Sequence, residues 1–243
     1  MPKVRADVRM VDQGLVESRA KAQRLILAGL VRRSADHVIR NAAEKVPDDV
    51  DLILEEKDPY VSRGAGKLLP ALDAHLSRLD GLIVLDVGAS TGGFTDLALQ
   101  RGASKVYAVD SGHGQLHLRL REDPRVVNLE RTNARYLGKN QIPEPVNVVT
   151  IDVSFISVTK ILPVLPPLMA PGAFAFILVK PQFEAARGET VKGVVKDEAV
   201  RERTVSEVLS ACTALGWRRL STIPSPVVGP KGNQEFLVTC RQD

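Results

Sequence analysis

The stretch Leu85-Asp-Val-Gly-Ala-Ser-Thr-Gly-Gly-Phe94 decides the fold prediction, because it joins an apolar strand expected at 83–87 to a helix expected at about 93–101. Its glycines allow the backbone to approach a ligand closely, and the helix N-terminus presents free N–H groups. In a doubly wound sheet, this first strand-to-helix crossing is the usual place for a nucleotide-like ligand. The stretch therefore predicts a nucleotide-type cofactor site.

Outward from this loop, apolar strands alternate with helices. Continuous apolar strands separated by helices indicate a parallel sheet that is covered on both faces. The last two strands have no helix between them, so one of them is expected to run antiparallel. The sequence thus predicts an α/β domain with a mostly parallel seven-stranded sheet. Its further strands are expected at 105–109, 126–128, 146–152, 173–179, 218–223 and 234–240, and its helices at about 114–121, 157–169 and 197–215.

The residues of the loop separate two possible cofactors. A dinucleotide-binding fingerprint requires a second glycine where this chain has Ser90, which counts against NAD and a dehydrogenase. Asp86 lies two residues before Gly88, where a carboxylate suits the cationic methionine end of S-adenosylmethionine. Asp110 ends the next strand and can accept both ribose hydroxyls. We predict S-adenosylmethionine over NAD, with a glycine turn used only for packing as the remaining alternative.

Polar residues end two later strands of the predicted sheet. Asp152 closes one apolar strand and Lys180 closes the next, so both are expected beside the ligand crevice. A lysine at this place can act as a base or position a hydroxyl proton. A surface ion pair at the sheet edge is the alternative. From the residues alone, Lys67 and Glu235 could serve either function or packing, and no His or acid spacing predicts a metal site.

The charge distribution predicts a polyanion partner for the N-terminal region. The chain has 243 residues and a net charge of only +4, but residues 1–40 carry nine Lys/Arg against four acids. Residues 41–58 reverse this balance, with two Lys against seven acids. A basic segment beside an acidic one is typical of proteins that bind nucleic acid, although a solvated helix face would explain the same charges.

The first 57 residues are expected to form a small α/β unit. Ser18 can cap a helix over 18–28, and a short strand is expected at 30–33. Residues 58–80 form a connector that ends in a helical run at 68–76.

Export and membrane insertion are not expected. Cys212 and Cys240 form no metal-ligand pattern, and the N-terminus carries alternating charge instead of a signal-peptide core, so a cytoplasmic location is predicted. Residues 161–179 carry no charge, but their prolines and glycine would interrupt a membrane-spanning helix.

Taken together, these segments resemble the TlyA family, also labelled hemolysin A, of ribosomal RNA 2′-O-methyltransferases. The resemblance implies an S4-like RNA-binding domain at 1–57, a linker and first helix at 58–80, and an FtsJ-like (RrmJ-like) domain at 81–243 with the Rossmann-like class I methyltransferase fold. The matching stretches are 14–22, 60–68, 86–96, 112–116, 130–135, 152–157, 179–184 and 225–236.

The resemblance also implies roles for individual residues. The family's Lys-Asp-Lys-Glu tetrad maps onto Lys67, Asp152, Lys180 and Glu235. Lys180 would assist deprotonation of the ribose hydroxyl, and Lys67 would help hold the target nucleotide. The implied S-adenosylmethionine contacts are Asp86, Gly88, Ala89, Ser90, Thr91, Gly92, Gly93, Phe94, Asp110, Asn133, Ala134, Arg135 and Asp152. The implied RNA contacts are Arg19, Lys21, Arg24, Arg32, Arg33 and Arg63.

The implied substrate is a cytidine ribose of 23S rRNA, and of 16S rRNA as well in longer family members, with ribosomal subunits as partners. One departure is that residues 30–37 lack the Asn-Gly turn usual in S4 domains, so no tight hairpin is expected there. Two alternatives are a membrane-active hemolysin, as the family label suggests, and an RNA-binding protein without catalysis. The absence of a signal peptide opposes the first, and the intact tetrad opposes the second.

Overall fold

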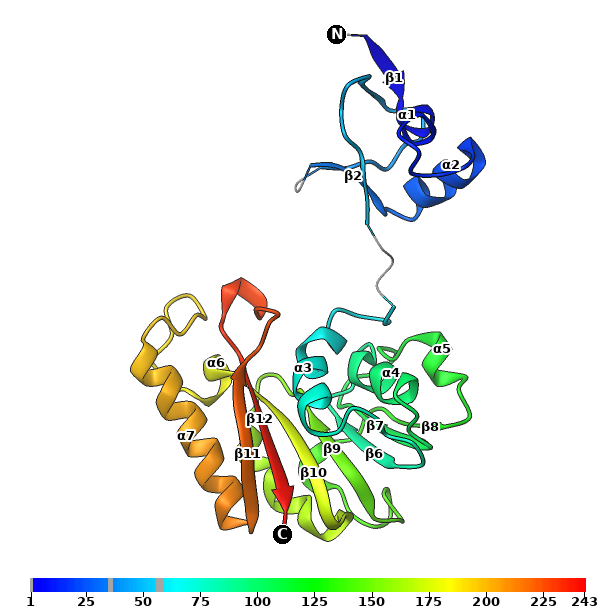
Figure 1. Cartoon of the computed structure of the whole chain (residues 1–243). Coiled ribbons are helices and arrows are strands. Elements are labelled where there is room, and N and C mark those ends of the chain that lie inside the picture. The colour runs from blue at the N-terminus through cyan, green and yellow to red at the C-terminus, as the bar shows by residue number, and fades with distance from the viewer. Residues whose placement is uncertain (1, 35–36, 56–58) are drawn as a thin grey trace. The chain divides into compact units, whose positions relative to one another are not determined.

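The computed structural model describes residues 2–34, 37–55 and 59–243 (Figure 1). The chain divides into two compact units, Met1–Pro59 and Tyr60–Asp243. Each unit has its own hydrophobic core.

The larger unit is built on a seven-stranded sheet with the strand order β11-β12-β10-β9-β6-β7-β8. The strands β6 to β10 run parallel, whereas β12 is antiparallel to both β10 and β11. The predicted fold class is therefore confirmed. The strands are β6 Ile83–Val87, β7 Lys105–Val109, β8 Val126–Leu129, β9 Val146–Ile151, β10 Met169–Val179, β11 Trp217–Pro224 and β12 Phe236–Gln242.

Both faces of this sheet are covered. The helices α3 (Ala65–His75) and α4 (Gly93–Gln100) pack on one face, against Val84 of β6 and its neighbours. The helix α7 (Glu198–Ala214) lies on the other face, in the core that contains Leu85. Adjacent residues of a strand enter different cores because their side chains point to opposite faces. Two single turns, α5 Leu118–Arg121 and α6 Pro181–Glu184, complete the helices.

The strand order changes direction at β6. From β6 the chain continues outward through β7 and β8 on one side, and through β9 and β10 on the other. In such a sheet, ligands bind in the crevice outside the carboxyl ends of the strands at this switch point. The crevice between the ends of β6 and β9 is therefore the place to look for a site.

The segment expected to form one helix at 157–169 forms three 3₁₀ turns instead: η2 Val158–Lys160, η3 Leu162–Val164 and η4 Pro166–Leu168. Pro163, Pro166 and Pro167 lack the N–H donors that a continuous α-helix needs, so that prediction was wrong. Among the described residues, no helix combines the length and apolar character needed to span a bilayer.

Two further helices begin at other residues than the sequence predicted. The helix expected at 114–121 covers only α5, and the one expected at 68–76 begins at Ala65.

The smaller unit packs two helices beside short strands. Its core contains Met10 of α1, Ile26 of α2 and Val31 of β2, and Ser18 caps α2 as predicted by accepting from the backbone N of Lys21. The elements are β1 Lys3–Arg5, α1 Ala6–Asp12, α2 Arg19–Leu27, β2 Val31–Ser34, β3 His37–Val38, β4 Lys45–Pro47 and β5 Ile53–Leu54.

The pairing of β2 with β3 shows that the expectation of no tight hairpin at residues 30–37 was wrong. The two strands pair antiparallel, with Ser34 opposite His37, so a close hairpin pairing forms without the Asn-Gly turn. The two connecting residues, 35 and 36, lie outside the described residues. The strand β2 also pairs with β5 on its other edge, so it is the central strand of a three-stranded sheet. This second pairing stabilises β2 in addition to the hairpin with β3.

Candidate active site

The loop between β6 and α4 makes contacts that require glycine at two positions. Gly88 has a φ of 86°, and a Cβ there would lie 2.4 Å from the carbonyl oxygen of Asp152. A Cβ on Gly93 would lie 2.4 Å from Ser62 Oγ and 3.0 Å from the backbone N of Ala65. These glycines seat the loop against the end of β9 and the start of α3. Part of the motif therefore serves packing as well as ligand approach.

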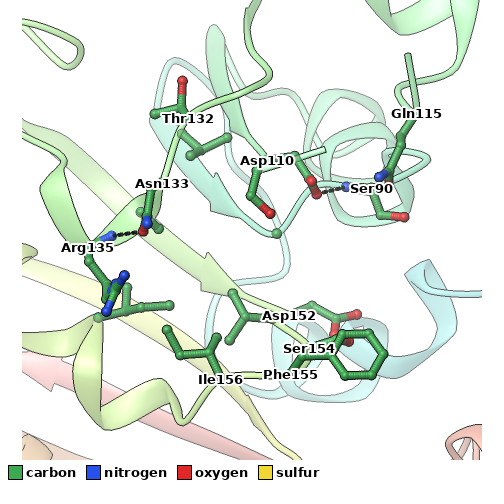
Figure 2. Close-up of a pocket in the computed structure, with 16 residues that line it drawn as sticks. Ser90, Asp110, Gln115, Thr132, Asn133, Arg135, Asp152, Ser154, Phe155 and Ile156 are labelled. Carbon is green, nitrogen blue, oxygen red and sulfur yellow. Dashed lines mark hydrogen bonds between the residues drawn. The ribbon is translucent and has the colours of Figure 1, made fainter. Parts of the chain in front are cut away.

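A cavity of about 460 Å³ opens beside this loop, at the carboxyl ends of β6, β7 and β9 (Figure 2). Most of the predicted cofactor residues line it: Gly88, Ser90, Asp110, Asn133, Ala134, Arg135 and Asp152. The other residues of the wall were not predicted as cofactor contacts: Val109, Ser111, Gln115, Thr132, Ile161 and the segment 153–156. This segment follows directly on Asp152, so its position after a strand end was the available signal. The cavity has the place and size expected for a nucleoside-type ligand.

Asp110 connects two loops at the wall of this cavity. Its Oδ2 accepts a hydrogen bond from the backbone N of Ser90 at 2.8 Å, and its Oδ1 accepts one from the N of Gly112 at 2.7 Å. Each carboxylate oxygen can accept a second hydrogen bond. Asp110 therefore holds the glycine loop and retains acceptor capacity toward the cavity.

Asp86 lies beneath the loop and lines neither this cavity nor the one described below. Its carboxylate accepts hydrogen bonds from Thr95 Oγ1 at 2.7 Å and Thr150 Oγ1 at 2.8 Å. Complete burial raises the pKa of Asp86 to about 6, despite these two hydrogen bonds. Gly92 also lines neither cavity. It is the N-cap of α4, and a Cβ there would lie 2.2 Å from Cδ1 of Leu120. A direct cofactor contact by either residue gains no support from the structure.

A second cavity of about 670 Å³ adjoins the first. The two share Gly88, Ser90, Asp152 and Ser154, so they meet at the end of β9. The second cavity is lined by further predicted residues and by part of the segment before β12. The predicted residues are Ala89, Thr91, Gly93, Phe94, Arg63, Lys67 and Lys180. The segment contributes Val227 to Gly229, which lie in the matching stretch 225–236 but were not predicted as site residues. One ligand could occupy each cavity, with the reacting groups at the shared wall.

Lys180 lines the second cavity and contacts two residues of the shared wall, Asp152 and Ser154. Its Nζ is 2.5 Å from Asp152 Oδ1 in an ion pair and donates a hydrogen bond to Ser154 Oγ at 3.0 Å. The Lys180 side chain is only 9% exposed. The strands β9 and β10 pair in parallel up to Ile151 and Ile177, so both strands end at the same edge of the sheet. The predicted proximity of Asp152 and Lys180 is thus found in the structure.

The other two tetrad residues form a second ion pair. Lys67 Nζ of α3 lies 2.6 Å from Oε2 of Glu235, whose side chain is completely buried. Gln182 Nε2 donates to the other carboxylate oxygen, Oε1, at 3.4 Å. A Cβ on Gly229 would lie 2.3 Å from this same oxygen, so the loop before β12 closes over the carboxylate. The four residues, far apart in sequence, line or underlie one cavity.

The cations predicted to contact RNA fall into two groups. Three of them form ion pairs, Arg19 with Asp7, Lys21 with Glu17, and Arg32 with Glu55. Arg24, Arg33 and Arg63 are exposed and have no ion pair within the described residues. In the same described part of the chain, no group of three or more His, Cys, Asp and Glu side chains could hold a metal ion.

Comparison with known proteins identifies the family. The family model of the FtsJ-like methyltransferases matches residues 60–242. The chain belongs to the FtsJ-like methyltransferase family. The resemblance seen in the sequence is confirmed by a TlyA from Mycobacterium tuberculosis, a 16S/23S rRNA (cytidine-2′-O)-methyltransferase. It is 43% identical over 98% of this chain and 90% of its own length. Hemolysin A of Brachyspira hyodysenteriae is 40% identical over 96% of this chain and 98% of its own length.

Solved structures agree with this family assignment. A Streptococcus thermophilus protein provisionally named a hemolysin has a TM-score of 0.76 and 40% identity, covering 100% of this chain and 89% of that one. The N-methyltransferase NodS from Bradyrhizobium japonicum, in complex with S-adenosyl-L-homocysteine, has a TM-score of 0.53 at 12% identity. It covers 77% of this chain and 89% of its own, and shows the fold alone. The FtsJ-like unit thus has the fold of S-adenosylmethionine-dependent methyltransferases.

Proposed function

We propose that this chain is an S-adenosylmethionine-dependent 2′-O-methyltransferase that modifies a cytidine ribose of ribosomal RNA. The observation that carries the proposal is the Lys180–Asp152 pair at the wall shared by two cavities. A transfer between two bound ligands requires such a meeting point, and a proton-handling side chain placed there serves a hydroxyl acceptor. The named activity of the TlyA relative supports the same reaction.

The first cavity fits S-adenosylmethionine. Asp110 has acceptor capacity for ribose hydroxyls, and Asp152 supplies a carboxylate for a cationic ligand. Asp152 Oδ1 is buried and has no hydrogen bond within the described structure beyond its ion pair with Lys180. Ser90 and Asn133 to Arg135 would form the remaining wall around the nucleoside. When bound, S-adenosylmethionine supplies an electrophilic methyl group.

The second cavity is the proposed place of the target nucleotide. Lys180 would orient the 2′-hydroxyl and take part in removing its proton, while Asp152 holds the lysine through the ion pair. Ser154 limits the rotation of the same ammonium group. Lys67 would hold the nucleotide from the opposite side, and the buried carboxylate of Glu235 fixes Lys67 in place. Catalysis by these residues consists of positioning and proton transfer.

The smaller unit is proposed to bind RNA as an S4-like domain. Arg24 and Arg33 are exposed, and exposed arginines suit contacts to phosphate. Arg63 lies in the wall of the second cavity and would contact RNA next to the target. The proposal includes 23S rRNA within ribosomal subunits as the substrate, with 16S rRNA as a second candidate. It places the protein in the cytoplasm because that is where this RNA is found.

The test is methyl transfer from radiolabelled S-adenosylmethionine to unmethylated 23S rRNA, 16S rRNA and both ribosomal subunits. The proposal predicts label in an alkali-stable dinucleotide that contains cytidine, because a 2′-O-methyl group blocks cleavage of the following phosphodiester. Label released as a modified base would contradict ribose methylation. Cofactor binding without label in any RNA would favour an RNA-binding protein without catalysis.

A further inference from the structure

The segment 152–158 carries Asp152 and Ser154 and connects β9 to η2. It forms part of both cavities. Its first residue is fixed by a hydrogen bond from the backbone N of Asp152 to the carbonyl oxygen of Val87 at 2.9 Å. Phe155 within it is 91% exposed and has a φ of 64°, a conformation that is costly for a residue with a side chain. The segment therefore needs outside contacts to keep its shape.

Those contacts come from the residues that follow Lys180. Segments 152–158 and 180–184 touch at three successive places. Lys180 contacts Asp152 and Ser154 at the first. The ring of Phe183 lies 5.0 Å from that of Phe155 at the second. Glu184 forms the third, where its Oε1 accepts from the N of Val158 at 2.8 Å and its Oε2 accepts from Ser157 Oγ at 2.5 Å.

We propose that Glu184 is a positioning residue that holds segment 152–158 against Lys180, so that Asp152 and Ser154 stay within reach of the lysine Nζ. Glu184 touches neither cavity, and thus acts through the segment rather than on a ligand. The inference rests on the proposed function, because it assigns Glu184 a part in keeping the proton-handling pair assembled. Hydrogen bonds to an ionised carboxylate are stronger than those between neutral groups, so the charge itself contributes to the hold.

The surroundings of Glu184 make its hydrogen bonds to Ser157 and Val158 sensitive to pH. Partial burial raises the pKa of its carboxyl group against the opposing effect of the bonds from Ser157 and Val158. The charged groups that face it are Glu207 of α7, which also raises the pKa, and Lys160 of η2, which lowers it. Glu207 is itself paired with Arg203. As pH falls, protonation of Glu184 removes the charge that strengthens both hydrogen bonds.

The test compares kcat of the full-length enzyme with that of Glu184→Gln, using S-adenosylmethionine and the RNA found to accept methyl groups. Glutamine offers one acceptor oxygen in place of two and carries no charge, so it holds Val158 and Ser157 less strongly. We therefore expect kcat to fall about tenfold to a hundredfold, as small misplacements of reacting groups do. The KM for RNA should change much less. The ratio of wild-type to variant kcat should be largest at high pH and shrink toward low pH, because only the wild type loses the carboxylate charge there.

Two further variants keep the result interpretable. Glu207→Gln removes a nearby acid but leaves both hydrogen bonds of Glu184 intact, so it should retain wild-type kcat. Ser157→Ala removes one of the two hydrogen bonds of Glu184, together with the hydrogen bonds between Ser157 Oγ and Thr159. Combined with Glu184→Gln it should lower kcat by little more than Glu184→Gln alone. If Glu184→Gln fails to fold, as shown by its thermal unfolding, Ser157→Ala carries the test through its own smaller loss.

Wild-type kcat in a folded Glu184→Gln variant, or in Ser157→Ala if Glu184→Gln does not fold, would overturn the inference. A loss that is equal at every pH would also contradict it. These outcomes leave the proposed function standing, since the wild-type enzyme is active in each. A wild-type enzyme that methylates no RNA would instead refute the proposed function.

Discussion

Replacing Lys67 by methionine should destabilise the larger unit as well as remove a proposed nucleotide contact. Methionine matches the length of lysine but leaves the Glu235 carboxylate buried without its cation. Glu235 is completely buried, Lys67 is 13% exposed, and Nζ lies 2.6 Å from Oε2, so the lost interaction is close and poorly hydrated. Removing one partner of a buried ion pair costs about 3–5 kcal/mol, because the remaining charge is uncompensated.

A second mutation, Glu235→Gln, separates the loss of stability from the loss of catalysis. Glu235→Gln in the Lys67→Met background removes the unpaired charge, so the double variant should regain most of the lost free energy of unfolding. Urea denaturation of the four proteins at pH 7.5 gives the coupling free energy. Methyl transfer should stay low in the double variant although its stability returns. If the free energy of unfolding of Lys67→Met is lower than that of the wild type by less than about 1 kcal/mol, the ion pair behaves as a surface pair and the expected cost of burial is wrong.

Two other variants test the electrostatics elsewhere in the chain. An unfolded Asp carboxyl has a pKa near 3.9 and burial raises that of Asp86 to about 6, so the stability from this group is full below pH 4 and is lost as pH rises through 6. Asp86→Asn does not titrate, so its free energy of unfolding, measured by urea denaturation, should rise by about 3 kcal/mol relative to that of the wild type between pH 4 and 7.5. A difference in free energy of unfolding that does not change with pH would contradict this. Replacing Arg24 and Arg33 by alanine should weaken RNA binding and lower the slope of log K against log salt by about 1 for each lost phosphate contact, and an unchanged slope in filter-binding titrations would remove them from the interface.

The sequence predicted the sheet because its strands are continuous apolar runs. The segments 83–87 and 105–109 are strands in the structure at those bounds. Burial on both faces requires apolar residues at every position, and this pattern is visible without a structure. The antiparallel pairing near the C-terminus followed from the missing helix between the last two strands.

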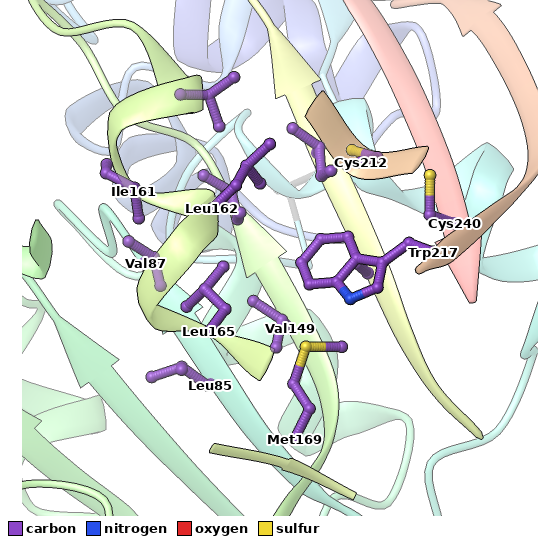
Figure 3. Close-up of a cluster of buried hydrophobic side chains, with 14 of the residues drawn as sticks. Leu85, Val87, Val149, Ile161, Leu162, Leu165, Met169, Cys212, Trp217 and Cys240 are labelled. Atoms are coloured by element: carbon purple, nitrogen blue, oxygen red, sulfur yellow. The ribbon is translucent and has the colours of Figure 1, made fainter. Parts of the chain in front are cut away.

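The segment 157–169 was not predicted correctly because its apolar spacing suits a helix while its prolines forbid one. Figure 3 shows the result, with Ile161, Leu162 and Leu165 in the same buried cluster as Leu85 and Val87. The apolar residues of this segment are buried on 3₁₀ turns, although their spacing would also suit one buried face of an α-helix. Apolar periodicity alone therefore could not distinguish the two local structures.

The candidate site was predictable where residues end strands. Asp152 and Lys180 follow neighbouring parallel strands, so their proximity follows from the topology. The partner of Lys67 was not predictable from residues, since Glu235 is 168 positions away and meets it only through the packing of α3 near β12. The cofactor contact of Asp86 stays a prediction, because a carboxylate beside a glycine loop can equally accept hydrogen bonds from two threonines beneath it.

The central claim is that Lys180, held by Asp152, handles the proton of a ribose hydroxyl at the wall shared by the two cavities. The most direct test is single-turnover methyl transfer to the accepting rRNA by Lys180→Ala, with Lys139→Ala as a matched control for an exposed lysine outside both cavities. Lys180→Ala should bind S-adenosylmethionine and RNA but transfer methyl groups at least a hundredfold more slowly, within the range of about 10²–10⁴ typical of a lost acid–base group. Transfer by Lys180→Ala at the rate of the Lys139→Ala control would contradict this role of Lys180.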